Sequence, residues 1–107
     1  FKQNRRIAVL GDMLELGEFS KELHENVGKE VVKNNIDILI CLGKNAKYIV
    51  EQAKKSNMDA EKIVYLNDAN SVVKYIKDIW TKNDVILFKA SNGMRFFDIV
   101  DKLKEVF

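Results

Sequence analysis

Four short apolar runs divide the chain at regular intervals. They occupy residues 7–10, 36–42, 63–66 and 85–88, and each is rich in β-branched residues. None of them alternates apolar with polar residues, as a half-exposed antiparallel strand would. Continuous apolar runs of this kind are typical of parallel strands that are covered on both faces. The pattern therefore predicts four parallel β-strands.

The segments between and after these runs have the spacing of amphipathic helices. In the first segment Leu23, Val27 and Val31 recur on one face, and Ser20 is the expected N-cap. Either Asp68 or Asn70 is expected to cap the third helix. In the second helix the positions expected to face the core are Ala46, Ile49, Val50 and Ala53. In the third helix they are Val72, Val73, Ile76, Ile79 and Trp80. In the last helix they are Phe96, Phe97, Ile99, Val100 and Leu103.

The resulting order βαβαβαβα predicts an α/β fold. It is a Rossmann-like open sheet of mainly parallel strands, with helices on both faces and right-handed connections. The 107 residues suit one domain, residues 1–107, with its own core. Ligands of such sheets bind beyond the carboxyl ends of the strands. The expected functional rim is therefore formed by residues 11–19, 43–45, 67–70 and 89–94.

Composition narrows the class of protein. With 47% hydrophobic residues, 32% charged residues and a net charge of +2, the chain has the profile of a globular protein without a basic surface for nucleic acid. Cys41 has no second cysteine to pair with, which fits a reducing compartment. No apolar run approaches the roughly 20 residues that span a bilayer. We expect a cytoplasmic protein that contacts no membrane, and a first residue, Phe1, that is not methionine suggests a piece of a longer chain.

An acidic loop follows the first predicted strand. Asp12, Glu15 and Glu18 crowd this loop beside Gly11 and Gly17. A carboxylate cluster can bind a metal ion or a substrate ammonium, or act as a general base. Solvated loop carboxylates are the alternative, and Glu18 can simply favour the positive end of the following helix dipole. Because this loop lies at the expected functional rim, binding or catalysis by its carboxylates is kept as a hypothesis beside the structural alternative.

Gly43 and Lys44 stand between a predicted strand and a predicted helix, where a phosphate-binding loop would be found. The motif G-x-x-x-x-G-K-[ST] requires a glycine where Ile38 stands and a hydroxyl where Asn45 stands, so the match fails. No G-x-G-x-x-G motif occurs either. We therefore expect Gly43 to let the backbone turn, and we expect no cradle for nucleotide phosphates in this chain.

The last strand-to-helix junction carries cations and small polar residues. Lys89 ends the strand, and Ser91, Asn92 and Gly93 precede the predicted helix, with Arg95 nearby. The first N–H groups of a helix lack internal partners, so an anion would be stabilised here. The alternative is that Ser91 or Asn92 caps the helix while Lys89 points into water.

Two residues of the first predicted helix are expected to have structural roles. His24 is the single histidine, and we expect it to pack or to form a hydrogen bond from the helix to a neighbouring loop rather than to bind metal. Gly28 costs about 1 kcal/mol in a helix relative to alanine. It is expected to mark a close approach of helix to sheet.

Three motifs carry a resemblance to a known family. The stretches VLGDMLELGEFSKELHENVG, ICLGKNAKYI and DVILFKASNGMRFFDIVDKL resemble the carboxy-terminal domain of Mur ligases over nearly the whole chain. The last stretch departs from the family's K-G-S-R-G-M, because Ala90 replaces glycine and Asn92 replaces arginine. The GDMLELGE loop resembles the branch of the family that joins D-alanyl-D-alanine to UDP-N-acetylmuramoyl-tripeptide in peptidoglycan precursor synthesis.

The resemblance implies a three-domain, ATP-dependent amide ligase of which this chain is the cleft-closing domain. ATP and Mg²⁺ would be bound mainly by the central domain, which is the expected intramolecular partner, and the isolated chain would bind no cofactor or metal and be inactive. No catalytic residue is expected here. The residues that would line the substrate cleft are Asp12, Glu15, Lys44, Asn45, Lys89, Ser91, Asn92 and Arg95. The family's D-S-Y-N-A-N-P segment does not occur in the chain, so one strand and one helix at the amino-terminal edge of the domain are expected to be absent.

A stand-alone flavodoxin-like binding or regulatory module is the alternative from a different class. A response-regulator receiver requires a phosphoacceptor aspartate at the end of a central strand. The predicted strand ends Leu42-Gly43 and Leu66-Asn67 offer none.

Overall fold

The sheet has four parallel strands in the order β3-β2-β1-β4. A computed structural model of the chain describes residues 5–12 and 19–89. Each predicted strand is present, with small differences at the ends. The strands are β1 (Arg6–Gly11), β2 (Ile38–Leu42), β3 (Ile63–Leu66) and β4 (Val85–Lys89). The predicted open parallel sheet is confirmed, and β2 begins two residues later than expected.

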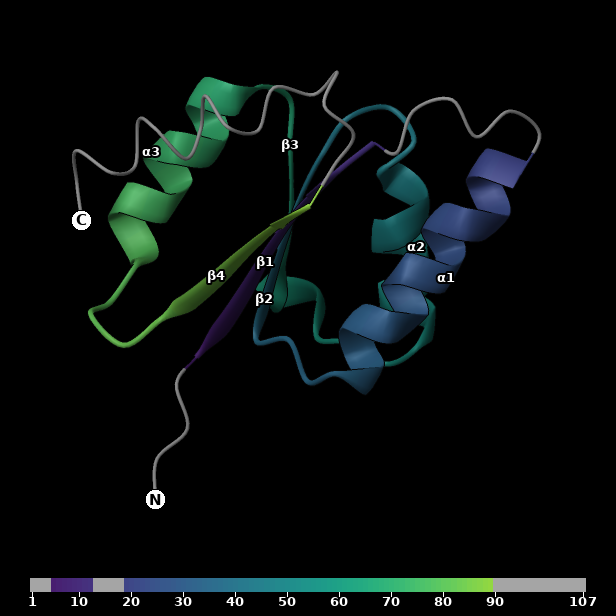
Figure 1. Ribbon diagram of the computed structural model, residues 1–107, viewed down its shortest axis with the longest axis horizontal. Helices are drawn as coiled ribbons and strands as arrows, with labels where there is room; N and C mark the ends of the chain where they lie inside the picture. The colour runs from purple at the N-terminus through teal and green to yellow at the C-terminus, as the bar shows by residue number, and fades with distance from the viewer. Residues whose placement is uncertain (1–4, 13–18, 90–107) are drawn as a thin grey trace.

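Helices cover both faces of this sheet (Figure 1). They are α1 (Ser20–Lys33), α2 (Lys47–Lys55) and α3 (Ala69–Ile79), with a short 3₁₀ helix η2 (Ala60–Lys62) before β3. No helix in the described ranges 5–12 and 19–89 is long and apolar enough to cross a membrane. The predicted helix that carries Phe96 to Leu103 lies outside the described residues.

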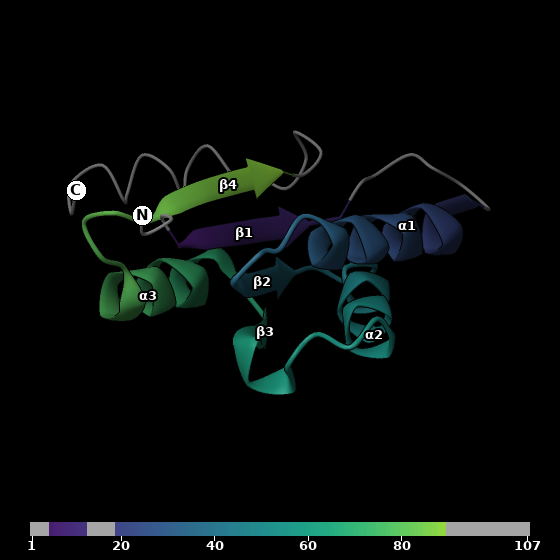
Figure 2. The ribbon, with the colours of Figure 1, turned by 90° about the horizontal axis from the view of Figure 1, so that it is seen from below.

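The direction of each crossover determines the face on which its helix lies. The connections through α1 and α2 lead the chain from β1 to β2 to β3, and both helices pack on the same face. The connection through α3 returns in the opposite direction to β4, and α3 packs on the other face (Figure 2). Right-handed crossovers require this arrangement.

Alternate residues of the two central strands supply two separate cores. Ile7 and Val9 of β1 pack with Val72 and Ile76 of α3. Ala8 and Leu10 face the other way, towards the layer of α1 and α2. Because β1 and β2 are covered on both faces, their side chains are almost all buried, as the continuous apolar runs predict.

The helix ends agree with the sequence expectations only in part. The Asp68 carboxylate accepts a hydrogen bond of 2.7 Å from the Ser71 N–H, so Asp68 is the cap of α3. The expectation that Ser20 caps α1 is wrong, because Ser20 is already the first helical residue and Phe19 holds the cap position. Trp80 was expected within the third helix, but the helix ends at Ile79 and Trp80 has extended backbone angles.

Gly28 allows two helices, rather than a helix and the sheet, to approach closely. A Cβ atom at Gly28 would lie 2.7 Å from the Ile49 carbonyl oxygen and 2.8 Å from the Gln52 Cβ, both in α2. The expected helix-to-sheet contact is therefore corrected to a contact between α1 and α2. Any side chain at this position would push the two helices apart.

The continuous apolar run of β4 was expected to be covered on both faces, and one face is open. Leu87 pairs with Ala8 and so faces the side of α1 and α2, yet it is 54% exposed. Val85, two residues earlier, is 53% exposed, and Leu23 of α1, expected in the core, is 39% exposed. The reason is that α1 and α2 pack over β1 and β2, so this face of β4 lies beside the helices rather than beneath them.

An ion pair joins the beginning of β1 to the loop before β4. Arg5 donates from Nε to Asp84 Oδ1 (3.0 Å) and from Nη2 to Asp84 Oδ2 (2.6 Å), and Nη2 also donates to the Ile79 carbonyl. The Asp84 carboxylate accepts further bonds from the Thr81 N–H and hydroxyl. The hydrogen bond from Arg5 is the main cause of a lowered Asp84 pKa.

We predict that this ion pair makes stability depend on pH. A carboxyl whose folded pKa lies below its unfolded value of about 3.9 stabilises the fold fully above about pH 4, and this stabilisation is lost as the pH falls through the folded pKa. Asp84→Asn should lower the free energy of unfolding by about 1–3 kcal/mol at pH 7, and the difference from wild type should shrink in acid. Urea unfolding at several pH values measures this, with Asp78→Asn, an exposed position on α3, as control. A difference that stays constant from pH 7 to pH 2 would contradict the prediction.

We also predict that Cys41 is inert in the folded chain. Its side chain is fully buried, and burial raises the pKa of the thiol to about 12. Since the thiolate is the reactive form, a disulfide reagent at pH 8 should modify Cys41 on unfolding in urea and leave the native chain unmodified for hours. Rapid modification without denaturant would show that this face of the core opens readily.

Candidate functional site

The carboxyl ends of β1, β2 and β4 meet at one edge of the sheet. Leu10 is in register with Lys89, and Gly11 is in register with Leu42. Asp12 follows β1, Gly43 follows β2 and Lys89 ends β4. The predicted meeting of the Asp12 and Lys89 segments at one edge is therefore confirmed.

The Asp12 carboxylate binds the beginning of α2. Its Oδ1 accepts hydrogen bonds of 2.8 Å from both the Asn45 and Ala46 N–H groups, and the residue is only 7% exposed. These N–H groups precede the first turn of α2, where backbone donors lack helical partners and the helix dipole favours a negative charge. Asp12 is therefore not the solvated loop carboxylate that was the alternative for this loop, since its carboxylate fixes the turn before α2.

Gly43 is required at the turn for two reasons. Its φ of +117° is a conformation that residues with a side chain rarely adopt. A Cβ atom there would also lie 2.5 Å from Asp12 Oδ1. The expectation that Gly43 lets the backbone turn is confirmed, and the structure adds that the turn makes room for the carboxylate.

Tyr65 holds the same turn from the other side, and the sequence did not reveal this role. Its hydroxyl donates to the Gly43 carbonyl oxygen, across the pairing of β3 with β2. The pKa of Tyr65 is raised, mainly by desolvation and to a smaller extent by the negative charge of Asp12. The signal in the sequence is a tyrosine just before the end of an edge strand, and only the pairing of the strands identifies its partner.

Cations occupy the outer side of this edge. Lys44 and Lys89 are exposed, and Asn45 is partly buried. Lys47 and Lys21 place their ammonium groups 5.1 Å and 5.7 Å from the centre of the Tyr48 ring. A surface of this kind attracts carboxylates and phosphates.

Other predicted residues either lie elsewhere or are not described. His24 is fully buried, and its Nδ1 lies 2.6 Å from the Ser20 carbonyl oxygen, so the expected packing is confirmed while this bond stays within its own helix. In the described residues, no three His, Cys, Asp or Glu side chains are grouped as metal ligands would be. The predicted site residues Glu15, Ser91, Asn92 and Arg95 lie outside the described residues.

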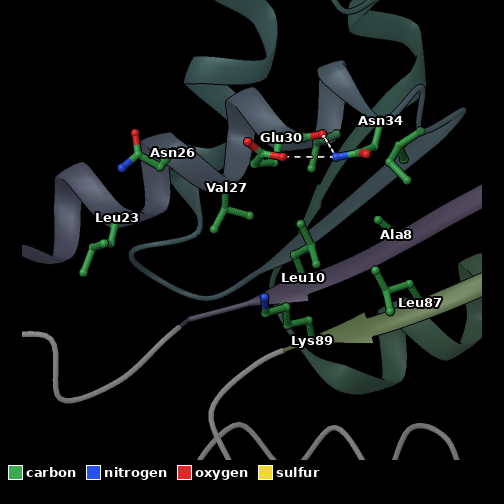
Figure 3. Close-up of a pocket in the computed structure, with 11 residues that line it drawn as sticks. Ala8, Leu10, Leu23, Asn26, Val27, Glu30, Asn34, Leu87 and Lys89 are labelled. Atoms are coloured by element: carbon green, nitrogen blue, oxygen red, sulfur yellow. Dashed lines mark hydrogen bonds between the residues drawn. The ribbon is translucent and has the colours of Figure 1, made fainter.

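An apolar groove of about 630 Å³ begins at the same edge (Figure 3). Leu23 and Val27 of α1 form one wall, and Ala8 and Leu10 of β1 lie at its floor. On the far side, β4 contributes Leu87 and Lys89. The sequence predicted these apolar positions but assigned them to a closed core.

We predict that Asp12 contributes to stability. Asp12→Ala removes the acceptor for two backbone N–H groups and should lower the free energy of unfolding by about 1–3 kcal/mol. Asp12→Asn keeps a side-chain oxygen and should lose less. Urea unfolding measures both variants, and Glu51→Ala, at an exposed position of α2, is the control. Unchanged stability of Asp12→Ala would mean that water replaces the carboxylate without cost.

Most of the chain is similar in sequence to two bacterial ligases. It is 34% identical over 101 residues to UDP-N-acetylmuramoyl-tripeptide--D-alanyl-D-alanine ligase of Bacillus subtilis (strain 168), which covers 94% of this chain and 22% of that protein. It is 31% identical over 99 residues to the ligase of the same name from Synechocystis sp., covering 92% of this chain and 21% of that protein. The chain thus spans about a fifth of the length of these relatives.

The structure and a family model agree with these relatives. A crystal structure of MurF from Acinetobacter baumannii superposes with a TM-score of 0.81 over 97% of this chain and 23% of that one, at 19% identity, which establishes a shared fold. The family model described as "Mur ligase, glutamate ligase domain" matches residues 1–92. The chain therefore belongs to the Mur ligase family.

Proposed function

We propose that the full-length protein is an ATP-dependent ligase that joins D-alanyl-D-alanine to UDP-N-acetylmuramoyl-tripeptide, and that this chain is its carboxy-terminal, cleft-closing domain. The observation that carries the proposal is the identity of 34% and 31%, over more than nine tenths of the chain, to two ligases with this name. A cytoplasmic location belongs to the same proposal.

The chain's own contribution would be to hold substrates at the carboxyl edge of the sheet. In such a reaction a carboxylate activated as an acyl phosphate is attacked by the amine of the dipeptide, with loss of phosphate. Lys89 is exposed beside the end of β1, where its ammonium could bind a carboxylate of a peptide substrate. Placing the amine near the acyl carbon in this way is worth several kcal/mol of the barrier.

The Gly43 turn would present Lys44 and Asn45 to the same cleft. Asp12 holds the Asn45 and Ala46 N–H groups, and Tyr65 holds the Gly43 carbonyl oxygen. This fixes the backbone from which Lys44 extends. In the proposed role Asp12 acts through the turn, while Lys44 and Asn45, together with Glu15, Ser91, Asn92 and Arg95 from outside the described residues, are proposed substrate contacts.

The described residues do not fit ATP or Mg²⁺. The N–H groups of Asn45 and Ala46, which resemble a phosphate-binding turn in their position, already bind the Asp12 carboxylate. No group of potential metal ligands occurs in residues 5–12 and 19–89. We therefore assign nucleotide and metal binding to other parts of the full-length protein and expect the isolated chain to form no amide.

Membership of the Mur ligase family argues against the alternative of a stand-alone flavodoxin-like module. The family match extends over residues 1–92 and so includes both candidate junctions at the edge of the sheet up to Asn92.

We predict that Lys89→Ala in the full-length enzyme raises the Michaelis constant of a peptide substrate or lowers turnover. Loss of one charged hydrogen bond of about 1.5–3 kcal/mol corresponds to a fall of roughly 10–100-fold in kcat/KM. Steady-state assays that vary each substrate in turn measure this. Lys89→Arg should retain part of the activity, and Lys82→Ala, an exposed lysine before β4, should behave as wild type.

Two outcomes would count against different parts of the proposal. Wild-type kinetics for Lys89→Ala would remove Lys89 from the site and leave the ligase assignment intact. A full-length wild-type protein that forms no amide from these substrates and ATP would refute the ligase assignment itself.

A further inference from the structure

The turn between β2 and α2 has the geometry of an oxyanion site. Asn45 and Ala46 are consecutive residues, and both of their N–H groups donate to one oxygen atom, Asp12 Oδ1, at 2.8 Å. Successive N–H groups that converge in this way form a concave backbone surface that binds anions. The nine-residue helix α2 follows directly, and its dipole adds positive potential at the same point.

Gly43 brings the backbone close to the bound anion. A Cβ atom at this position would lie 2.5 Å from Asp12 Oδ1 and 2.7 Å from Asp12 Cγ. Phosphate-binding turns use glycine for the same purpose, because a side chain would hold the backbone away from the phosphate oxygens. The next residue, Lys44, is exposed and supplies a cation beside the turn. A glycine, two converging donors and a lysine are thus present together.

The anion bound in this turn belongs to the chain itself. Asp12 stands 33 positions before Asn45, at the end of β1, and is only 7% exposed. Its second oxygen, Oδ2, accepts no hydrogen bond within residues 5–12 and 19–89. No buried side-chain oxygen of these residues lacks a partner, so Oδ2 is in contact with solvent. The site is therefore closed at the N–H groups and open to water on the other side.

We propose that residues 43–46 form an oxyanion site that the chain fills with its own Asp12 carboxylate, and that Asp12 thereby keeps phosphate out of this turn. Asp12 is joined to β1, so its binding costs no translational freedom, whereas a free phosphate ion would lose that freedom. The bound carboxylate also repels a second anion. The proposal concerns the anion specificity of the turn and does not depend on the proposed ligase activity.

The surroundings of the turn explain what this exclusion achieves. Lys44 and Lys89 are exposed at the same edge of the sheet, and their charges attract phosphate-bearing ligands. An empty turn beside them would compete for the same phosphate, because backbone N–H groups and a lysine bind phosphate together. With Asp12 bound, the backbone donors are occupied, and an anionic ligand meets the exposed lysines instead. A repulsive group contributes to specificity in this way as much as an attractive one does.

Hydrogen–deuterium exchange of the full-length protein tests the proposal. Asp12→Ala empties the site, so the Asn45 and Ala46 amides should exchange roughly 10–100-fold faster than in the wild type, the factor for one charged hydrogen bond. Inorganic phosphate should slow this exchange again in Asp12→Ala and leave the wild-type amides unchanged. Sodium chloride at the same ionic strength is the control for screening. Mass spectrometry with residue-level fragmentation follows the two amides.

Asp12→Asn is the matched variant. Its side-chain amide keeps the shape of the carboxylate and still fills the site, so phosphate should not slow exchange of the two amides. A phosphate effect of equal size in Asp12→Asn and Asp12→Ala, or in the wild type, would place the ion elsewhere and overturn the proposal. Slowing of exchange in Asp12→Ala by sodium chloride alone would show screening, and it would overturn the proposal as well.

The amides of β2 show whether Asp12→Ala keeps its fold, because β2 is paired with β1 and β3 inside the sheet. If the variant is unfolded in chloride, phosphate should restore protection of β2 together with that of Asn45 and Ala46. Absence of any recovery would overturn the proposal. Recovery with formate and none with phosphate would show a site that accepts carboxylates alone, which also overturns it. None of these measurements uses ligation, so they succeed or fail independently of the proposed function.

Discussion

The hydrogen bonds from the Asn45 and Ala46 backbone to the Asp12 carboxylate are the contact on which the functional edge depends. They join the end of β1 to the beginning of α2, segments separated by more than 30 positions in the chain. Gly43 makes this possible, because any side chain there would occupy the space of the carboxylate. Tyr65 adds the end of β3 to the same assembly. Three of the four strand ends are thereby fixed relative to one another.

This arrangement separates the charges at the edge into an inner and an outer set. The negative charge of Asp12 faces inwards and stabilises a helix start, while Lys44 and Lys89 remain exposed. Within the described residues, the groups left to meet a ligand at this edge are therefore mainly cationic. A peptide substrate joined to a nucleotide diphosphate would bring both carboxylates and phosphates to such a surface, which is consistent with the proposed role in substrate binding.

The sequence was sufficient for the fold because the signals for it are local. Continuous apolar runs marked β1 and β2 as buried parallel strands, and Asp68 marked the start of α3. The role of Asp12 could not be read in this way, since nothing near Asp12 in the chain points to Asn45. Gly28 was recognised as a close contact but assigned to the wrong neighbour, because spacing within one helix does not tell which element packs against it. Leu87 looks like a core residue in the sequence, and its exposure depends on what covers β4 rather than on its own identity.

The ion pair of Arg5 with Asp84 lies at the opposite end of β1 from the candidate site. A six-residue strand spans about 20 Å, and mutational effects on stability at sites more than about 10 Å apart add almost independently. The end of β1 and β4 near Asp84 and the opposite end near Lys89 can therefore accept sequence changes separately. An engineer could change residues around Lys89 and Lys44 and restore lost stability by changes around Asp84, without one set of substitutions undoing the other.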